Sequence, residues 1–303
     1  MTGPDTGNGY AALREGAAWL DVSTRGRIRV TGEDRARLLH ALTTNNIQQL
    51  EPGESCYAFF LSAQGRVLAD VNVFCFPDHF LLDTEPETAQ KVLEHLDRYI
   101  IADDVTVEDI AASTAAIVVA GPRAAEVARA GEGSLILEVS FTGGPGRMII
   151  VPVEERDSLV QRLEPAGAVA ASGEDFRVVR LENGRPRYGD DISERYLAQE
   201  TNELRALNFQ KGCYLGQEIV ERVRSRAQIH RVLMPLQIEG AELPAPGTKL
   251  QAQGRDAAEI TSAAWSPVLG KVVALAYVRT EHTRVGAVLD LSGRRAVVGA
   301  APV

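Results

Sequence analysis

The stretch Lys-Gly-Cys-Tyr-Leu-Gly-Gln-Glu at residues 211–218 is the most informative part of this 303-residue chain. Two glycines, Gly212 and Gly216, lie beside a cysteine, just before a segment whose pattern predicts a helix. Glycine permits positive φ and a close approach of the backbone to a ligand. Lys211 and the start of the helix would both favour the thiolate and lower the pKa of Cys213. The alternative is a glycine turn beside a cysteine that only packs.

These eight residues also resemble a family motif. All of them match the K-G-C-Y-x-G-Q-E motif of the YgfZ-type folate-binding proteins, which are relatives of the glycine-cleavage T-protein (aminomethyltransferase) and are associated with the maturation of iron–sulfur enzymes. The resemblance continues in the same order from residues 20–23 to residues 261–263 and 274–279. It implies an α+β fold of the aminomethyltransferase type and a bound tetrahydrofolate or a derivative of it.

The hydrophobic pattern predicts two cycles of strands and helices before residue 231. Strands are expected at residues 27–31, 57–61, 67–76, 80–82, 116–119, 135–139 and 148–153, and the second to fourth of these form an antiparallel meander. Helices are expected after residues 32–34, after residues 84–86, and at residues 121–129, 158–163 and 176–182. Residues 172–175 resemble a capping box that starts the last of these helices. The alternation is compatible with two ferredoxin-like halves.

After residue 231 the pattern changes to short β-like runs that are separated by glycine and proline. The runs lie at residues 232–238, 249–251, 259–263, 272–278, 288–291 and 296–298. Such regular spacing predicts a small antiparallel β-barrel, closed or nearly closed. We therefore expect a flexible tail at 1–15, a folate-binding α+β domain at 16–231 with halves at 16–110 and 111–231, and a C-terminal barrel at 232–303.

The composition excludes several classes of protein. No run of about 18 apolar residues occurs, and the first residues lack the pattern of a secretion signal, so we expect a cytoplasmic protein without a membrane span. The net charge of −9 gives no attraction to nucleic acid. The cysteines, Cys56, Cys75 and Cys213, are too far apart for a metal pair, and the five histidines are dispersed. We therefore predict no resident metal site or iron–sulfur cluster.

A second stretch, at residues 180–189, resembles the R-x-E-x-G-x-P-x-x-G segment that YgfZ-type proteins share with the T-protein. In the T-protein the matching glutamate binds the pterin ring of folate, which implies this role for Glu182. A carboxylate suits the role because it can accept two hydrogens from a 2-amino-4-oxopterin. Arg180 and Tyr188 of the same segment are further candidates for folate contacts. The alternative for Glu182 is a surface acid at the end of a helix.

A third stretch, at residues 64–71, resembles a turn and strand of the T-protein that end in two consecutive acids, one of which positions the reacting folate nitrogen. Here the pair is Ala69 and Asp70, so only one acid is present. Either Asp70 keeps the catalytic position or the role is lost. The valines that alternate with Asp70 allow a third interpretation, in which Asp70 lies on a solvated face of the strand.

The remaining candidates surround the glycine-rich stretch. Gly212, Tyr214 and Gln217 are expected to line the ligand site, although an aromatic residue after a turn can also be only packed. Arg222 and Arg224 belong to a basic run at residues 222–226 and are candidates for binding the anionic glutamate tail of folate. The alternative for this run is a solvated helix face.

Three functions remain open on the sequence alone. The first is a tetrahydrofolate-binding accessory protein that supports the maturation or repair of iron–sulfur enzymes through transient contacts, with Cys213, Lys211 and Asp70 as the candidate reactive residues. The second is a tetrahydrofolate-dependent one-carbon transferase of the T-protein type, and the third is a folate-linked scaffold. The full motif around Cys213 favours the first, and Ala69 weakens the second. A thiolate at Cys213 could attack a one-carbon adduct, bridge to the cluster of a partner, or sense oxidation.

Overall fold

The computed structural model describes residues 7–226 and 229–299, which form two compact units. The barrel unit comprises the described parts of Met1–Ser23, Ser113–Pro186 and His230–Val303. The signature unit comprises the described parts of Thr24–Ala112 and Arg187–Ile229, and it contains the glycine-rich stretch. No helix among the described residues is long and apolar enough to cross a membrane.

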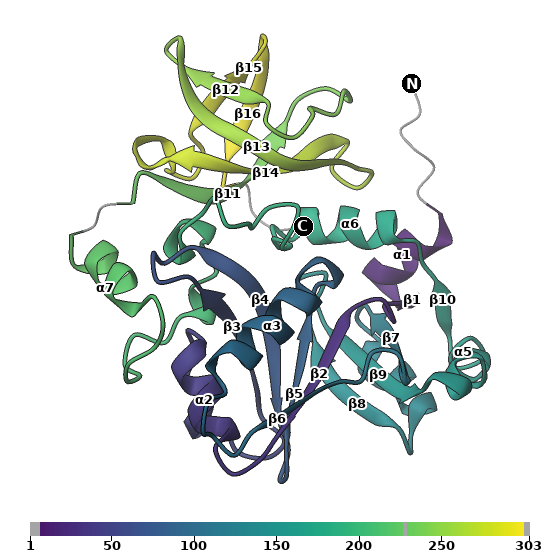
Figure 1. The fold of residues 1–303 in the computed structure, drawn as a ribbon. Coiled ribbons are helices and arrows are strands. Elements are labelled where there is room, and N and C mark those ends of the chain that lie inside the picture. The colour runs from purple at the N-terminus through teal and green to yellow at the C-terminus, as the bar shows by residue number, and fades with distance from the viewer. Residues whose placement is uncertain (1–6, 227–228, 300–303) are drawn as a thin grey trace. The chain divides into compact units, whose positions relative to one another are not determined.

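The signature unit is built on a five-stranded antiparallel sheet with the order β3-β4-β5-β2-β6 (Figure 1). Its strands are β2 (Gly26–Thr31), β3 (Ser55–Leu61), β4 (Val67–Cys75), β5 (Phe80–Thr84) and β6 (Thr106–Asp109). Its helices are α2 (Arg35–Leu42), α3 (Ala89–Tyr99) and α7 (Gln217–Arg226), with short 3₁₀ turns η1 (Ile47–Gln49), η2 (Pro86–Thr88), η5 (Ala198–Thr201) and η6 (Leu204–Ala206). The predicted meander of β3, β4 and β5 is confirmed.

Side-chain alternation gives this sheet two different faces. On β4, Val71 and Val73 join a buried cluster with apolar residues of α2 and α3. The alternate residues Asp70 and Asn72 face the opposite side, because successive side chains of a strand point to opposite faces. That side also carries an apolar cluster in which Phe59 meets Tyr188, Tyr214 and other buried residues of the segment after residue 187. The second face is therefore polar in one part and apolar in another.

The barrel unit contains a second five-stranded sheet with the order β10-β1-β7-β9-β8. Its strands are β1 (Ala17–Asp21), β7 (Thr114–Ala120), β8 (Leu135–Val139), β9 (Gly146–Pro152) and β10 (Ala168–Ala170), and only the pair of β1 and β10 is parallel. Its helices are α1 (Asn8–Glu15), α4 (Ala124–Val127), α5 (Arg156–Leu163) and α6 (Gly173–Glu182), with 3₁₀ turns η3 (Ala128–Gly131) and η4 (Val153–Glu155). The helix predicted at 121–129 is thus limited to α4 and η3.

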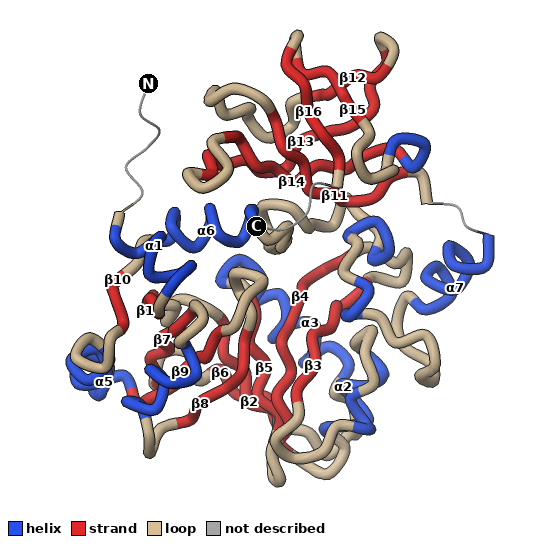
Figure 2. The backbone as a smooth tube through the Cα atoms, turned by 180° about the vertical axis from the view of Figure 1, so that it is seen from behind, coloured by secondary structure: helices blue, strands red, loops and turns tan. Residues whose placement is uncertain are grey.

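The six C-terminal strands close into a barrel with the order β11-β14-β13-β12-β15-β16, which confirms the predicted architecture (Figure 2). They are β11 (Arg231–Ile238), β12 (Lys249–Ala252), β13 (Arg255–Ser266), β14 (Lys271–Arg279), β15 (Val288–Leu291) and β16 (Arg294–Val298). Fifteen buried residues form the core of the barrel. Within residues 229–299, the 3₁₀ turn η7 (Thr280–His282) is the one helical element.

Two expectations about the N-terminal part need correction. The tail predicted at residues 1–15 is wrong for residues 8–15, because these form α1, which packs on α6 and buries Tyr10 and Leu13. Residues 1–6 lie outside the described residues. In addition, β1 precedes the boundary predicted between residues 110 and 111, yet it pairs with β7, which follows that boundary. The first sheet of the barrel unit therefore combines two distant segments of the chain.

Candidate functional site

The glycine-rich stretch forms a loop that ends at the start of α7. Gly216 has a φ of +84°, and a Cβ atom there would lie 2.7 Å from the carbonyl oxygen of Ser62. Only glycine fits this position, because both the left-handed φ and the close approach exclude a side chain. Gly212 is exposed and does not have a positive φ, so the conformation expected for both glycines occurs only at Gly216.

Lys211 points into the signature unit. Its Nζ donates hydrogen bonds to the carbonyl oxygens of His40 at 2.5 Å, Thr43 at 2.7 Å and Asn45 at 2.8 Å, at the C-terminal end of α2. It also lies 4.8 Å from the ring centroid of Tyr214. Burial lowers the pKa of Lys211 to about 7. The ammonium therefore closes the end of α2, where carbonyl groups otherwise lack partners.

Cys213 is exposed, and it differs in this from the other two cysteines. Cys56 is half-buried, and burial raises the pKa of its thiol to about 12. Cys75 is buried, and burial raises its pKa as well. Cys213 is thus the thiol that a reagent or a partner in solution reaches first.

The neighbours of Cys213 in sequence take structural positions. Tyr214 is buried in the apolar cluster on the second face of the sheet, and its backbone N–H donates to Oε1 of Gln217 at 3.3 Å. Arg222 and Arg224 are exposed on α7. The guanidinium of Arg224 lies 5.1 Å from the ring centroid of Phe209, whereas the side chain of Arg226 lies outside the described residues.

Asp70 is buried on the polar part of the same sheet face, with a relative exposure of 7%. The hydroxyl of Tyr57 donates to its Oδ2 at 2.8 Å, whereas Oδ1 has no hydrogen-bond partner among the described residues. Burial and the nearby charge of Glu85 raise the pKa of Asp70 to about 7. The interpretation of Asp70 as a residue on a solvated face is therefore wrong, since neighbouring chain covers that face.

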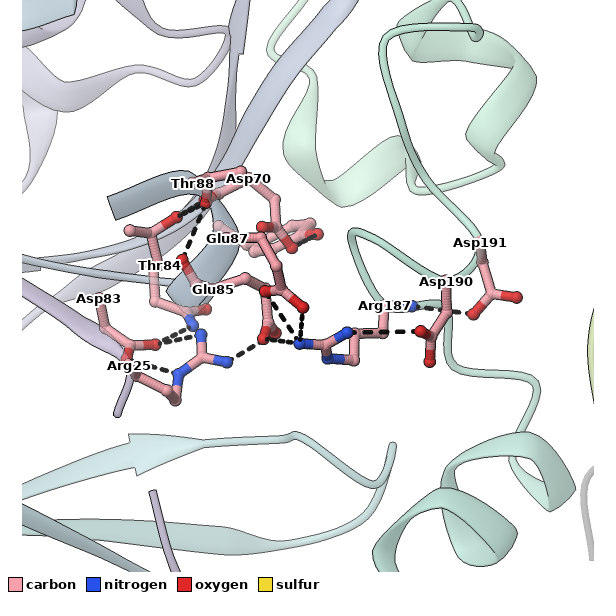
Figure 3. A network of polar contacts seen from close by, with 12 residues as sticks. Arg25, Asp70, Asp83, Thr84, Glu85, Glu87, Thr88, Arg187, Asp190 and Asp191 are labelled. Atoms are coloured by element: carbon pink, nitrogen blue, oxygen red, sulfur yellow. Dashed lines mark hydrogen bonds and ion pairs between the residues drawn. The ribbon is translucent and has the colours of Figure 1, made fainter. Parts of the chain in front are cut away.

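A network of charged residues lies beside Asp70 (Figure 3). Arg25 binds both oxygens of Asp83 at 2.8 and 2.9 Å and one oxygen of Glu85 at 2.6 Å. Arg187 binds the other oxygen of Glu85 at 3.0 Å and Glu87 at 2.7 Å. Glu85 is therefore held between two arginines that come from segments far apart in sequence.

The other two residues of the 180–189 stretch that were predicted to contact folate bind backbone carbonyls. The hydroxyl of Tyr188, in the signature unit, donates to the carbonyl oxygen of Leu68 at 2.7 Å. In the barrel unit, Nη1 of Arg180 donates to the carbonyl oxygen of Arg185 at 2.8 Å. Both side chains are buried, so both hold the local fold.

Glu182 lies at the end of α6 in the barrel unit and is also buried, with a relative exposure of 4%. Its Oε1 accepts hydrogen bonds from the hydroxyl groups of Tyr10 on α1 and Ser266 on β13, each at 2.6 Å. Its Oε2 accepts from Nη1 of Arg14 on α1 at 2.7 Å. Glu182 thus joins α1, α6 and the barrel, and it is not a surface acid.

These contacts limit what else Glu182 can bind. Each carboxylate oxygen has about two acceptor positions. Tyr10 and Ser266 fill both positions on Oε1, and Arg14 leaves one position on Oε2. A ligand can therefore gain one hydrogen bond from Glu182 as it stands, and a second bond requires Tyr10 or Ser266 to release Oε1.

The sequence identified Asp70 and Glu182 but not their partners. For Asp70, the sequence did contain a signal. Charged residues recur at every second position in two segments, Arg25 and Arg27 in one and Asp83 and Glu85 in the other, and residues with this spacing lie on the same face of a strand. For Glu182, no local pattern points to Tyr10, Arg14 or Ser266, which come from distant segments. In residues 7–226 and 229–299, no group of three or more histidine, cysteine, aspartate or glutamate residues is arranged to hold a metal ion.

Comparisons with known proteins agree with this architecture. The model of the GCVT N-terminal domain matches residues 4–135, and the model of the glycine cleavage T-protein C-terminal barrel domain matches residues 231–302. An aminomethyltransferase of Streptomyces coelicolor is 30% identical over 307 aligned positions, which cover 91% of this chain and 82% of that protein. An aminomethyltransferase of a Nostoc species is 25% identical, with 94% and 83% covered.

A solved structure shares the fold over nearly the whole chain. The glycine cleavage system aminomethyltransferase T from Bartonella henselae superposes with a TM-score of 0.87 at 20% identity, covering 96% of this chain and 86% of that one. At this level of identity the similarity shows the fold alone. It establishes the aminomethyltransferase-like fold, with its α+β part and its C-terminal barrel.

Proposed function

Because the chain belongs to the glycine cleavage T-protein (aminomethyltransferase) family, we propose that it binds tetrahydrofolate or a derivative of it. The observation that carries the proposal is the buried carboxyl of Asp70, whose Oδ1 has no hydrogen-bond partner among the described residues. A buried polar atom without a partner is costly, and a ligand that supplies the missing hydrogen bond offsets that cost. Tetrahydrofolate, when bound, would supply ring nitrogens that carry one-carbon units.

The residues present are compatible with such a ligand. Asp70 offers one unused oxygen to a ring nitrogen or its substituent, and Glu182 offers one unused acceptor position to the amino or N–H group of a pterin. Arg222 and Arg224 are exposed and cationic, which suits the carboxylates of a glutamate tail. We keep Asp70, Arg222 and Arg224 as candidate folate contacts of the signature unit and, separately, Glu182 as a candidate of the barrel unit. We treat Lys211, Tyr188 and Arg180 as parts of the supporting fold.

We further propose that the protein is an accessory factor that supports the maturation or repair of iron–sulfur enzymes. The support is Cys213, an exposed thiol within a motif that fully matches the YgfZ-type proteins. The partners would be iron–sulfur enzymes or their assembly proteins, in transient contact. The proposal keeps the predicted cytoplasmic location and the absence of nucleic-acid partners, in line with the net charge of −9.

A second candidate function is a one-carbon transfer reaction of the T-protein type. Two observations favour it: the relatives named aminomethyltransferase, and the pKa of Asp70, which burial and the charge of Glu85 raise to about 7. A carboxyl with such a pKa can exchange a proton near neutral pH. Ala69, in place of the other acid of the T-protein pair, weighs against this candidate.

Calorimetry with tetrahydrofolate tests the proposed binding. Glu182→Ala is expected to weaken binding at least tenfold, about 1.4 kcal/mol, because it removes the acceptor of the pterin contact. Glu174→Ala is the matched control, since Glu174 lies exposed on the same helix and should leave the affinity unchanged. Thermal unfolding of each variant separates lost binding from lost folding. Unchanged affinity in a folded Glu182→Ala protein would remove Glu182 from the site.

Complementation distinguishes the accessory function from the other candidates. In cells that lack the native gene, Cys213→Ser is expected to leave iron–sulfur enzymes inactive while the protein still folds and binds tetrahydrofolate. Cys56→Ser is the control, because that thiol is half-buried on β3. Full activity with Cys213→Ser would mean that the thiol has no role in the function, and it would favour the third candidate, a folate-linked scaffold.

A further inference from the structure

The groups around Asp70 are arranged in rows across the sheet of the signature unit. Asn72 on β4 pairs with Asp83 on β5, and Asp70 and Glu85 each lie two residues further along, on the same face. The hydroxyl of Thr84 donates to the backbone oxygen of Asp70 at 2.6 Å, which fixes the two segments together at this point. Asp70 therefore faces Glu85, as Figure 3 shows.

Asp70 has fewer charged partners than the carboxylates beside it. Asp70, Asp83 and Glu85 are all buried, and Arg25, buried with them, binds Asp83 and Glu85. Arg27, also buried, lies opposite Asp83 on the neighbouring strand and donates to the carbonyl oxygens of Arg25 and Ala111. Arg187 is half-buried and is shared among Glu85, Glu87 and Asp190. Among the described residues Asp70 forms no ion pair, and its side-chain partner is the neutral hydroxyl of Tyr57, which donates to Oδ2. A buried carboxylate without a cation is unfavourable, so the neutral acid form is the one this environment favours.

The hydrogen bonds of Asp70 agree with a neutral acid. With the proton on Oδ1, the carbonyl-like Oδ2 accepts from Tyr57, and the Oδ1 hydroxyl is a donor that no described residue uses. The ionised form would instead leave a charged, buried oxygen with no donor. Among the described residues, the titratable or charged groups that influence Asp70 most are Tyr57 on β3, Arg25 before β2, Asp83 on β5 and Glu85 after β5, and Tyr188 interacts with it as well.

Among these groups, Glu85 has the strongest influence on the charge of Asp70. Arg25 and Arg187 bind one oxygen of Glu85 each, at 2.6 and 3.0 Å, so two ion pairs hold this carboxylate in place. A fixed negative charge opposite Asp70 opposes a second one, and this repulsion is the largest effect on the pKa of Asp70 after burial itself. Arg187 therefore acts on Asp70 through Glu85.

From this geometry we propose that Glu85, fixed between Arg25 and Arg187, is a positioning residue that keeps Asp70 a neutral acid, so that its Oδ1 hydroxyl donates a hydrogen bond to an acceptor atom of the bound reduced folate. The inference rests on the proposed function and adds the protonation state in which Asp70 binds the ligand. It assigns Asp70 as a donor, whereas a carboxylate would be an acceptor. Binding of the ligand then weakens as Asp70 loses its proton.

The test is the pH dependence of tetrahydrofolate affinity, measured by calorimetry under anaerobic, reducing conditions from about pH 6 to pH 8.5. For the native protein the affinity is expected to fall with rising pH above about 7, approaching about tenfold per pH unit, because one proton is lost from the binding-competent form. Glu85→Gln removes the opposing charge, so the fall should move about one pH unit lower. Asp70→Asn should give a flat profile, because an amide donates at every pH.

Glu87→Gln is the matched control. Glu87 binds the same arginine as Glu85, but it is exposed and is not among the largest influences on the pKa of Asp70, so its profile should nearly coincide with that of the native protein. A purely structural role of the network would lower affinity at every pH equally in both glutamine variants. Affinity that rises through pH 7, or a Glu85→Gln profile that coincides with that of Glu87→Gln, would overturn the proposal.

A second measurement does not depend on the ligand or on the folding of a variant. The carboxyl carbon of Asp70 in the native protein, assigned by comparison with Asp70→Asn, is followed by ¹³C NMR as the pH changes. Titration near pH 7 is expected, and titration in the ordinary range of aspartate, about pH 4, would contradict the proposal. If the native protein binds no tetrahydrofolate at any pH, the proposed function fails, while this titration still tests the state of Asp70.

Discussion

Glu182 combines two roles at the scale of a single residue. Its oxygens hold Tyr10, Arg14 and Ser266, so the proposed pterin acceptor is also a connection between three elements of the barrel unit. Ligand binding and the internal contacts compete for the same acceptor positions. This competition predicts that removing an internal donor frees the carboxylate for the ligand.

We expect Tyr10→Phe to bind tetrahydrofolate more tightly than the native protein, because the loss of the hydroxyl frees a position on Oε1. The same change should lower the free energy of unfolding by about 1–3 kcal/mol, since a hydrogen bond to a charged group is lost. Ser266→Ala, which removes the other donor to Oε1, should act in the same direction. Calorimetry and urea unfolding measure the two effects. Weaker binding in both variants would mean that Glu182 serves the fold alone.

Cys213 illustrates what a motif can and cannot predict at this scale. The motif predicted that Lys211 favours the thiolate of Cys213. The thiol is exposed, but the ammonium of Lys211 is directed to the end of α2. Treating the native protein with N-ethylmaleimide should therefore modify one cysteine rapidly, and peptide mapping should identify it as Cys213. In Cys213→Ser, modification should become slow until the protein unfolds. Rapid modification of Cys56 or Cys75 in native conditions would contradict the burial of those thiols.

At the scale of elements, Lys211 binds the end of α2, but this contact requires the burial of its ammonium group. Three carbonyl oxygens at the end of the helix receive its ammonium, but burial lowers its pKa from 10.5 to about 7. Between these two pH values the unfolded chain binds a proton that the folded protein has released. Stability rises with pH wherever the unfolded state binds more protons, so this residue makes the protein more stable as the pH rises from about 7 towards 10.5.

Comparison with Lys211→Met isolates this effect. The difference in unfolding free energy between the native protein and the variant should increase in favour of the native protein from pH 7 to pH 10, as measured by urea unfolding. Other titrating groups cancel in the difference. A difference that stays constant over this range would mean that the three carbonyls hold the pKa of Lys211 near that of the unfolded chain.

The elements differ in how far the sequence predicts them. The start of α6 was predictable because its capping box is local, and Ser172 and Asp175 form it as expected. α1 was not predictable, because it has eight residues and no side-chain cap, and so short a helix is marginal alone. Its stability comes from packing on α6 and from the contacts of Tyr10 and Arg14 with Glu182, which no local pattern reveals.

At the scale of the whole molecule, the fold followed from alternation and spacing, whereas the site did not. Alternation left open whether Asp70 lies on a solvated face, since it says which side a residue faces but not what covers that side. The segment that covers the apolar part of this face follows residue 187, more than a hundred residues later in the chain. Chemistry that depends on burial, such as the raised pKa of Asp70, therefore required the structure.

The barrel is built from one continuous segment of the chain. All six of its strands come from Arg231–Val298 and pair only with one another, and the closed arrangement leaves no open edge. We therefore expect residues 229–303, expressed alone, to fold into a β-sheet protein with a cooperative urea transition, although a domain of this size is only marginally stable. Leu236→Asp, which places a charge in the barrel core, should abolish the transition in this fragment. Circular dichroism during a urea titration measures whether the fragment unfolds cooperatively. A non-cooperative curve for the unmodified fragment would mean that the barrel needs α6 to fold, since α6 packs on β13 and β14.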